Sequence, residues 1–311
     1  MLIKKLWNKW IEPKPFNSGW LPKADGHEVF FAEYGNQNGK PILVTHGGPG
    51  GCVKPMRARM FDLVKYRVIM FDQRGCGKSL PFGELKHNTT EDILFDMRRL
   101  LEYLKIEQKV ILQGGSWAST LMLLFAERNP DKVEKMLLSQ IFLADERNEK
   151  WIDEQCALFY PDFVEELRKP IKNWQNTAEY YLRLLNSNDE NKQKKALMTY
   201  ACFERLLGSV NPCFSDIDEV DENSLAYARI YAQFSANLFG IKSNEIMRNL
   251  KKIKHIPTLI VHNRLDMVCP LQGAYELAKK LENAKLVIVP EKGHVGDLLH
   301  KTIKQEIKKF L

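Results

Sequence analysis

Short aliphatic runs alternate with helical patterns along most of this 311-residue chain, and this alternation constrains the fold more than any other feature. The runs have the length and the β-branched or aliphatic composition of buried strands, and turn residues bound them. They are residues 28–33, 41–45, 67–71, 109–113, 135–138, 258–262 and 285–289. Helical patterns lie between them, notably at residues 91–104 and 117–128. Because parallel strands need crossover connections, the alternation predicts an α/β fold with a mostly parallel, doubly wound sheet and helices on both faces.

The alternation stops between about residues 142 and 250, where the sequence becomes aromatic-rich, charged and helix-patterned without a convincing strand. Strand patterns resume at residue 258, so one sheet is interrupted before its last strands. We therefore expect a core made of residues 1–141 and 251–311, and an inserted, all-helical cap subdomain at residues 142–250.

Charge and cysteine usage narrow the class of protein. The formal net charge is +7, but the lysines are scattered and no arginine-aromatic run indicates a nucleic-acid partner. No run approaches the roughly 18 apolar residues that cross a bilayer, so no membrane partner is expected. The six cysteines form no C-x-x-C pair, so we expect neither a metal site nor a disulfide scaffold. The first residues contain no apolar signal region, and together with the cysteine pattern this predicts a cytoplasmic protein. The sequence leaves monomer and small homo-oligomer open.

A serine stands on the turn between the strand at residues 109–113 and the helix at residues 117–128. This is the context of a nucleophile elbow, where Ser116 is held in a strained conformation with its hydroxyl exposed at the edge of the sheet. Small residues two before and two after the serine are part of the motif, and here they are Gly114 and Ala118 rather than two glycines. An ordinary strand-to-helix turn is the alternative interpretation of the motif taken alone.

The order of the other polar residues supports the elbow. α/β-Hydrolases present serine, then an acid, then histidine, with the last two on loops at the carboxyl ends of strands. Asp266 follows the strand at residues 258–262, and His294 follows the strand at residues 285–289. The sequence thus predicts an α/β-hydrolase fold in which Ser116 is the nucleophile, His294 its base and Asp266 the residue that orients the base.

Acyl transfer also needs two N–H donors for the tetrahedral oxygen, and a glycine-rich loop follows an early strand. In that loop, residues 44–51 (VTHGGPGG), Gly47 is the candidate for one donor, and the amide of Trp117 is the candidate for the other. We expect a structural or loop-orienting role for His46. The loop FDQRGCGKS at residues 71–79 lacks the spacing of a phosphate-binding loop and predicts a tight turn beside the same edge.

The elements HGGPGG, DQRGCGKS, NTT, GGSWAST, RLDMVCP and GH, in this order, resemble the proline iminopeptidase (prolyl aminopeptidase) family of α/β-hydrolase serine peptidases. The resemblance covers roughly residues 18–140 and 255–298. It implies triad roles for Ser116, Asp266 and His294. The implied activity is release of an N-terminal proline from short peptides with a free N-terminus, without a metal or cofactor.

The resemblance also implies a substrate pocket in the cap. The family's W-x-x-W-E element, whose glutamate binds the substrate's α-amino group, is matched here by Tyr200-Ala-Cys-Phe203-Glu204. A second family glutamate is replaced by Tyr231, and no Asp or Glu occurs from Asn223 to Asn244. An apolar, aromatic pocket for the proline ring is expected, with Phe203, Tyr227, Tyr231 and Phe234 as candidates that can equally be cap core.

Two rival functions stay open from the sequence. One is an esterase or amidase of the same fold whose cap accepts neutral acyl groups. The other is a non-catalytic binding module on a hydrolase scaffold. Epoxide hydrolase or dehalogenase chemistry would need a carboxylate at position 116, which the serine excludes.

Overall fold

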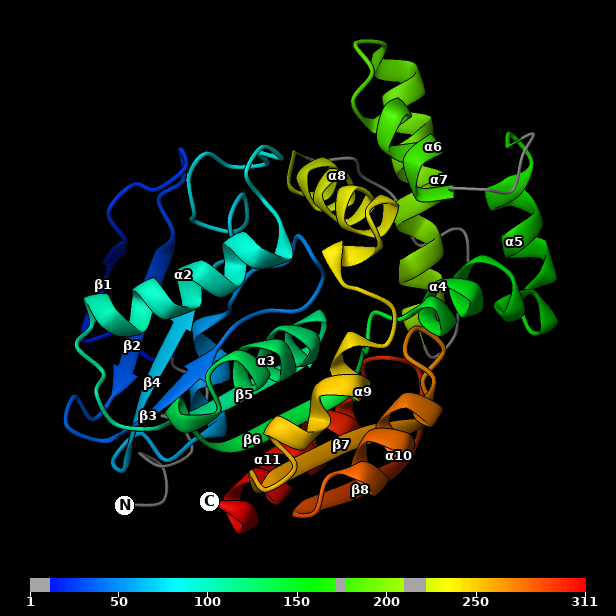
Figure 1. The fold of residues 1–311 in the computed structure, drawn as a ribbon. Helices are drawn as coiled ribbons and strands as arrows, with labels where there is room; N and C mark the ends of the chain where they lie inside the picture. The colour runs from blue at the N-terminus through cyan, green and yellow to red at the C-terminus, as the bar shows by residue number, and fades with distance from the viewer. Residues whose placement is uncertain (1–11, 172–176, 210–221) are drawn as a thin grey trace, which may run out of the picture.

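One eight-stranded sheet organises the molecule in the computed structural model, which describes residues 12–171, 177–209 and 222–311 (Figure 1). The strand order is β1-β2-β4-β3-β5-β6-β7-β8. All pairs from β4 to β8 are parallel, whereas β2 runs antiparallel to β4 and to β1 at one edge. The predicted mostly parallel sheet is confirmed, and the antiparallel pair at the edge adds to it.

The strands and helices have the following bounds. The strands are β1 Asn17–Trp20, β2 Phe30–Gly35, β3 Lys40–Val44, β4 Tyr66–Phe71, β5 Val110–Ser116, β6 Val133–Ile141, β7 Thr258–Leu265 and β8 Ala284–Lys292. The helices are α2 Thr90–Tyr103, α3 Trp117–Arg128, α4 Glu146–Asp153, α5 Pro161–Arg168, α6 Thr177–Leu185, α7 Glu190–Gly208, α8 Glu222–Ala236, α9 Glu245–Asn249, α10 Leu271–Lys280 and α11 Asp297–Phe310. Every predicted strand and both predicted helices have a counterpart.

Alternate residues of the central strands supply two hydrophobic cores, one on each face of the sheet. Leu43, Ile69 and Leu112 pack with α2, α3 and α10, whereas their neighbours along the strands pack with α11 on the other face. In Figure 1, α2, α3 and α10 lie in front of the sheet and α11 lies behind it. Period-two burial on both faces is what a doubly wound sheet requires, and it explains the continuously apolar strands.

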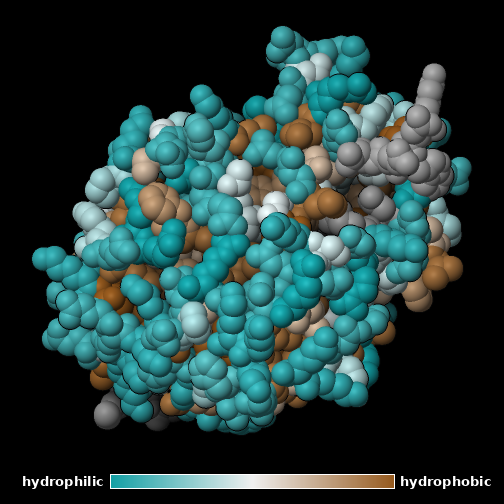
Figure 2. All heavy atoms as spheres, viewed as in Figure 1, coloured by the Kyte–Doolittle hydropathy of each residue, from teal (hydrophilic) through white to brown (hydrophobic). Residues whose placement is uncertain are grey.

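The chain between β6 and β7 is helical in its described parts. Its helices α4 to α8 project beyond the carboxyl ends of the strands, and the chain returns through α9 to β7 (Figure 1). Figure 2 shows a mostly hydrophilic face, with hydrophobic side chains visible where these helices meet the rest of the molecule. No helix among the described residues is long and apolar enough to span a membrane.

The short edge strand β1 was missed by the sequence patterns. Its four residues, NSGW, are mostly exposed and contain no β-branched or aliphatic side chain. Backbone pairing with β2 makes it a strand, and hydrophobic periodicity cannot detect such pairing.

Candidate active site

Ser116 lies on a sharp turn between β5 and α3. Its backbone has φ 58° and ψ −134°, a conformation that side-chain-bearing residues rarely adopt, and α3 starts at the next residue. A Cβ atom at Gly114 would lie 2.5 Å from the carbonyl oxygen of Ala118, so position 114 has no room for a larger residue. The Ala118 methyl is accommodated, and the strained serine between strand and helix has the geometry of a nucleophile elbow.

Asp266 and His294 meet at the carboxyl ends of the next two strands. Asp266 directly follows β7, and His294 comes two residues after β8, where Gly293 has a φ of 84°. His294 Nδ1 lies 2.8 Å from Asp266 Oδ2 and 3.0 Å from Oδ1. The carboxylate also accepts the backbone N–H groups of Val268 and Cys269, at 3.0 and 2.8 Å, so its orientation is fixed.

Electrostatics at this pair favour a charged imidazole. Burial by itself lowers the pKa of His294, but the Asp266 carboxylate and the Cys269 sulfur outweigh it and raise the pKa well above its usual value. Because Nδ1 faces the carboxylate, Nε2 is the ring nitrogen left for proton exchange.

Gln140 connects the histidine loop to the elbow. Its Nε2 donates to the carbonyl oxygen of His294 at 2.6 Å, and its Oε1 accepts from Ser139 Oγ at 3.1 Å. A Cβ atom added to Gly115 would lie 2.8 Å from the same Oε1, so the side chain of Gln140 passes directly beside the residue before Ser116. Sequence patterns missed Gln140, which stands at the end of a strand with a positive φ of 47° and matches no motif.

The glycine-rich loop after β3 lies against Ser116. A Cβ atom at Gly47 would be 3.2 Å from Ser116 Cβ and 3.8 Å from its Oγ. His46 is buried, and burial lowers its pKa below the usual value, so its ring is neutral. Its Nδ1 donates to the Gly47 carbonyl at 2.8 Å and its Nε2 accepts the N–H of Gln73 at 3.0 Å, which is the expected loop-orienting arrangement.

A small apolar pocket lies between the loops that carry Asp266 and His294 and the helices that follow β6. Phe203 and Tyr231, both predicted for the substrate pocket, line it together with residues that the sequence did not single out for binding. These are Ile152, Leu167, Thr177, Tyr200, Leu207, Ser235 and Val268. Val268 stands two residues after Asp266. A Cβ atom added to Gly208 would lie 3.8 Å from Val268 Cγ2 and 3.8 Å from His294 Cβ, so the pocket borders the histidine.

Two of the other residues predicted for the substrate site lie away from this pocket, and the side chain of the third is outside the described residues. Phe234 packs edge-on against the Trp117 ring at 5.3 Å, and Tyr227 contacts Gly50 of the glycine loop; neither lines the pocket. Glu204 belongs to α7, but its side chain lies outside the described residues.

Tyrosine rings form a row through the helices above the site. The ring centroids of Tyr181 and Tyr200 are 5.0 Å apart, those of Tyr200 and Tyr231 5.8 Å, and those of Tyr231 and Tyr227 6.3 Å. The row joins α6, α7 and α8, and its two middle members, Tyr200 and Tyr231, give the pocket an aromatic wall.

Comparison with known proteins identifies the fold and close relatives. The model of the α/β-hydrolase fold matches residues 40–300. A proline iminopeptidase of Arabidopsis thaliana is 36% identical over 288 residues, covering 90% of this chain and 76% of that protein. One of Neisseria gonorrhoeae is 35% identical over 286 residues, covering 90% and 91%.

Solved structures show the same architecture at low identity. An esterase from Rhodococcus sp. ECU1013 aligns with a TM-score of 0.60 at 17% identity, covering 94% of this chain and 98% of that one. An epoxide hydrolase from a hot-environment metagenome aligns with a TM-score of 0.62 at 14% identity, covering 95% and 98%. The serine on the elbow, the paired acid and histidine, and the relatives at about 35% identity therefore all point to one group of hydrolases.

Proposed function

This chain belongs to the proline iminopeptidase family of α/β-hydrolases, and on that premise we propose that it releases an N-terminal residue, preferentially proline, from short peptides with a free N-terminus. The observation that carries the proposal is the His294–Asp266 pair, held at 2.8 Å at the sheet edge where Ser116 occupies the elbow. The relatives named proline iminopeptidase supply the substrate class.

The reaction then follows from the roles of the side chains. Ser116 Oγ attacks the carbonyl carbon of the N-terminal residue while His294 Nε2 takes the hydroxyl proton. Asp266 keeps the proton of His294 on Nδ1 and stabilises the imidazolium. The amides of Gly47 and Trp117 donate to the oxyanion. His294 protonates the departing amine, and water hydrolyses the acyl-enzyme with the same residues acting in reverse.

The helices between β6 and β7 serve in this proposal as the cap subdomain, residues 142–250, over a core of residues 1–141 and 251–311. The pocket lined by Phe203 and Tyr231 receives the side chain of the N-terminal residue. Glu204 pairs with its ammonium group, because a buried ammonium without a partner is costly. Tyr231 replaces the second carboxylate that the family places in the cap, so selection for the free amine rests more heavily on Glu204.

We propose a cytoplasmic location, a monomer or small homo-oligomer, and no nucleic-acid or membrane partner. Among the described residues, Cys52 and Cys76 form no disulfide, which fits a reducing compartment.

Hydrolysis of proline p-nitroanilide, compared with its N-acetylated form, tests the proposal. We expect release of p-nitroaniline from the free-amine substrate and a loss of at least about a hundredfold in kcat/KM on acetylation, because the charge-assisted contact between the ammonium group and a carboxylate is lost. Equal rates on the two substrates would contradict the aminopeptidase and indicate an esterase or amidase that accepts neutral acyl groups.

A further inference from the structure

Gln73 is a buried side chain that no step of the proposed reaction uses. It follows β4 by two residues and is 2% exposed. It lies between the loop that carries Gly47 and the first residue of α3, which are the two segments expected to supply the oxyanion donors.

Both ends of the Gln73 amide are bonded, one to each segment. Its Nε2 donates to the carbonyl oxygen of His46 at 2.8 Å and to Thr45 Oγ1 at 3.2 Å. Its Oε1 accepts from the indole Nε1 of Trp117 at 2.9 Å. Only a primary amide offers two donors and an acceptor at these positions, so glutamine fits this place chemically.

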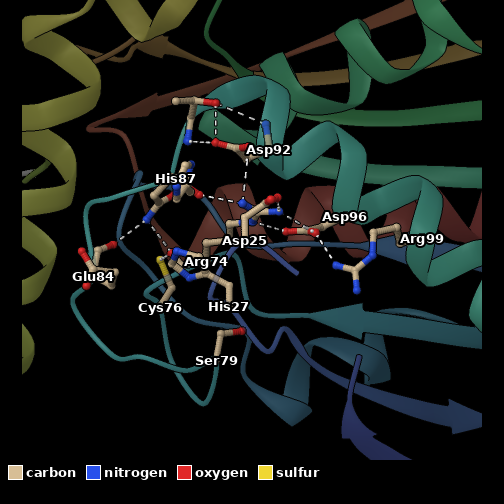
Figure 3. A network of polar contacts seen from close by, with 12 residues as sticks. Asp25, His27, Arg74, Cys76, Ser79, Glu84, His87, Asp92, Asp96 and Arg99 are labelled. Atoms are coloured by element: carbon tan, nitrogen blue, oxygen red, sulfur yellow. Dashed lines mark hydrogen bonds and ion pairs between the residues drawn. The ribbon is translucent and has the colours of Figure 1, made fainter. Parts of the chain in front are cut away.

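The backbone around Gln73 is held as well. Its own N–H donates to His46 Nε2 at 3.0 Å. The next residue, Arg74, is fully buried, and its guanidinium binds Asp96 at 2.6 Å and the His87 carbonyl at 2.7 Å, with Asp92 at 3.3 Å (Figure 3). Gln73 is therefore anchored to α2 through Arg74, and it bridges the two segments from a fixed base.

We propose that Gln73 is the positioning residue of the oxyanion hole: it sets the separation of the Gly47 and Trp117 amides by holding the His46 carbonyl with one end of its side chain and the Trp117 indole with the other. It contacts neither substrate nor reacting atoms and acts through His46 and Trp117. The inference rests on the proposed role of Ser116 as nucleophile. It explains how the Gly47 and Trp117 amides are held at the distance that the oxyanion needs. A shift of such donors weakens only the transition state, because they point to where the oxyanion develops.

Gln73→Met, which keeps the length of the side chain and removes its hydrogen bonds, is the direct test. We expect kcat to fall about tenfold to a hundredfold, which is no more than the fall caused by removing one oxyanion donor outright. KM should stay within about twofold of the wild-type value. The inhibition constant of an aldehyde analogue of proline, which forms a tetrahedral adduct with Ser116, should rise by the same factor as kcat falls. Gln233→Met is the matched control. Gln233 lies on α8, and its Nε2 also donates to backbone carbonyls, those of Leu85 at 2.8 Å and Asn88 at 3.2 Å, which belong to neither segment of the proposed oxyanion hole. It should leave kcat and the aldehyde affinity unchanged.

Trp117→Phe removes the indole donor and so breaks the hydrogen bond between Trp117 Nε1 and Gln73 Oε1. It serves as the test if Gln73→Met does not fold. We expect a smaller loss in kcat and in aldehyde affinity, and a double variant no worse than Gln73→Met alone, because both changes break one linkage. Unchanged kcat in folded Gln73→Met, or aldehyde affinity that stays constant while kcat falls, would overturn the inference. So would additive losses in the double variant.

p-Nitrophenyl acetate separates this inference from the proposed function. Its hydrolysis needs Ser116 and the oxyanion donors but no free amine. If the wild type hydrolyses the ester and ignores proline p-nitroanilide, the aminopeptidase proposal fails while the Gln73 variants remain fully testable on the ester.

Discussion

The two sides of the candidate active site are held together in different ways. On the sheet side, Asp266, His294 and Gln140 are joined by directional hydrogen bonds of 2.6 to 3.0 Å. On the helical side, the pocket walls come from ring packing, such as the 5.8 Å contact between Tyr200 and Tyr231. Hydrogen bonds fix reacting atoms to fractions of an ångström, whereas ring contacts tolerate exchange of one apolar group for another. We therefore expect the sheet edge to set the chemistry and the helices to set the choice of substrate.

Asp266→Asn is expected to have the largest effect on the sheet side. The amide would present N–H groups to His294 Nδ1, which forces the imidazole into the wrong tautomer, so kcat should fall about 10⁴-fold, as in other serine triads. KM should change little, because the aspartate does not contact substrate.

Asp145→Asn is the matched control for that variant. Asp145 is another buried aspartate that accepts two backbone N–H groups, from Arg147 and Asn148, but its side chain pairs with the Arg147 guanidinium rather than with a histidine. A comparable loss of kcat in both variants would show that buried aspartates affect activity through folding alone.

Tyr231→Ala is expected to have a smaller effect on the helical side. Loss of a ring that lines the pocket should lower kcat/KM about tenfold, mostly through KM, because roughly 1.4 kcal/mol of contact is removed at both ground and transition states. Leu158→Ala, on an exposed residue of the same segment, should be neutral. A fall in kcat alone would place Tyr231 in the chemistry instead.

The pH dependence reports on the same histidine. Because the pKa of His294 is raised well above its usual value, the neutral base appears only as pH rises through that higher value. We expect the acidic limb of kcat/KM to lie above pH 6.5, with activity increasing into the alkaline range. A limb at or below pH 6.5 would mean that the Asp266 carboxylate does not govern His294 in the free enzyme.

Glu127→Gln should have the smallest effect and none on catalysis. Glu127 lies on α3, and its pKa is raised from the usual 4.5 to about 8. Burial is the main cause, and the negative charge of Glu245 is the second. The folded state therefore keeps a proton that the unfolded chain loses, so stability is complete below pH 4.5 and is lost as pH rises through 8. The variant should unfold roughly 2–5 °C higher than wild type at pH 9 and show little difference at pH 5. Glu102→Gln, at an exposed position, is the matched control and should leave the unfolding temperature close to that of wild type.

Sequence alone predicted the sheet side of the molecule well, because its signals are local. Strand periodicity, the elbow at Ser116, and polar residues within two positions of the ends of β7 and β8 can all be recognised from neighbours in the chain. The structure adds the 2.8 Å contact between His294 and Asp266, whereas their catalytic roles stay predictions.

Long-range contacts explain what the sequence could not predict. Gln140 reaches His294 across 154 residues, and Gln73 reaches Trp117 across 44, through side chains that fit no motif. In the helices, any aromatic residue on an inward face matches the pattern of a pocket wall. The sequence therefore offers Tyr227 and Phe234 equally with Phe203 and Tyr231, and only packing shows which of them line the pocket.

Covalent labelling of Ser116 is the most direct test that this chain is a serine hydrolase. Wild type and Ser116→Ala would be treated with a fluorophosphonate, and the intact mass and the modified peptide measured alongside turnover of proline p-nitroanilide. We expect one adduct on the peptide that contains Ser116, complete loss of turnover with it, and a folded Ser116→Ala variant that is neither labelled nor active. Turnover by Ser116→Ala comparable to wild type, or an adduct on another residue that abolishes activity, would contradict the assignment of Ser116 as nucleophile.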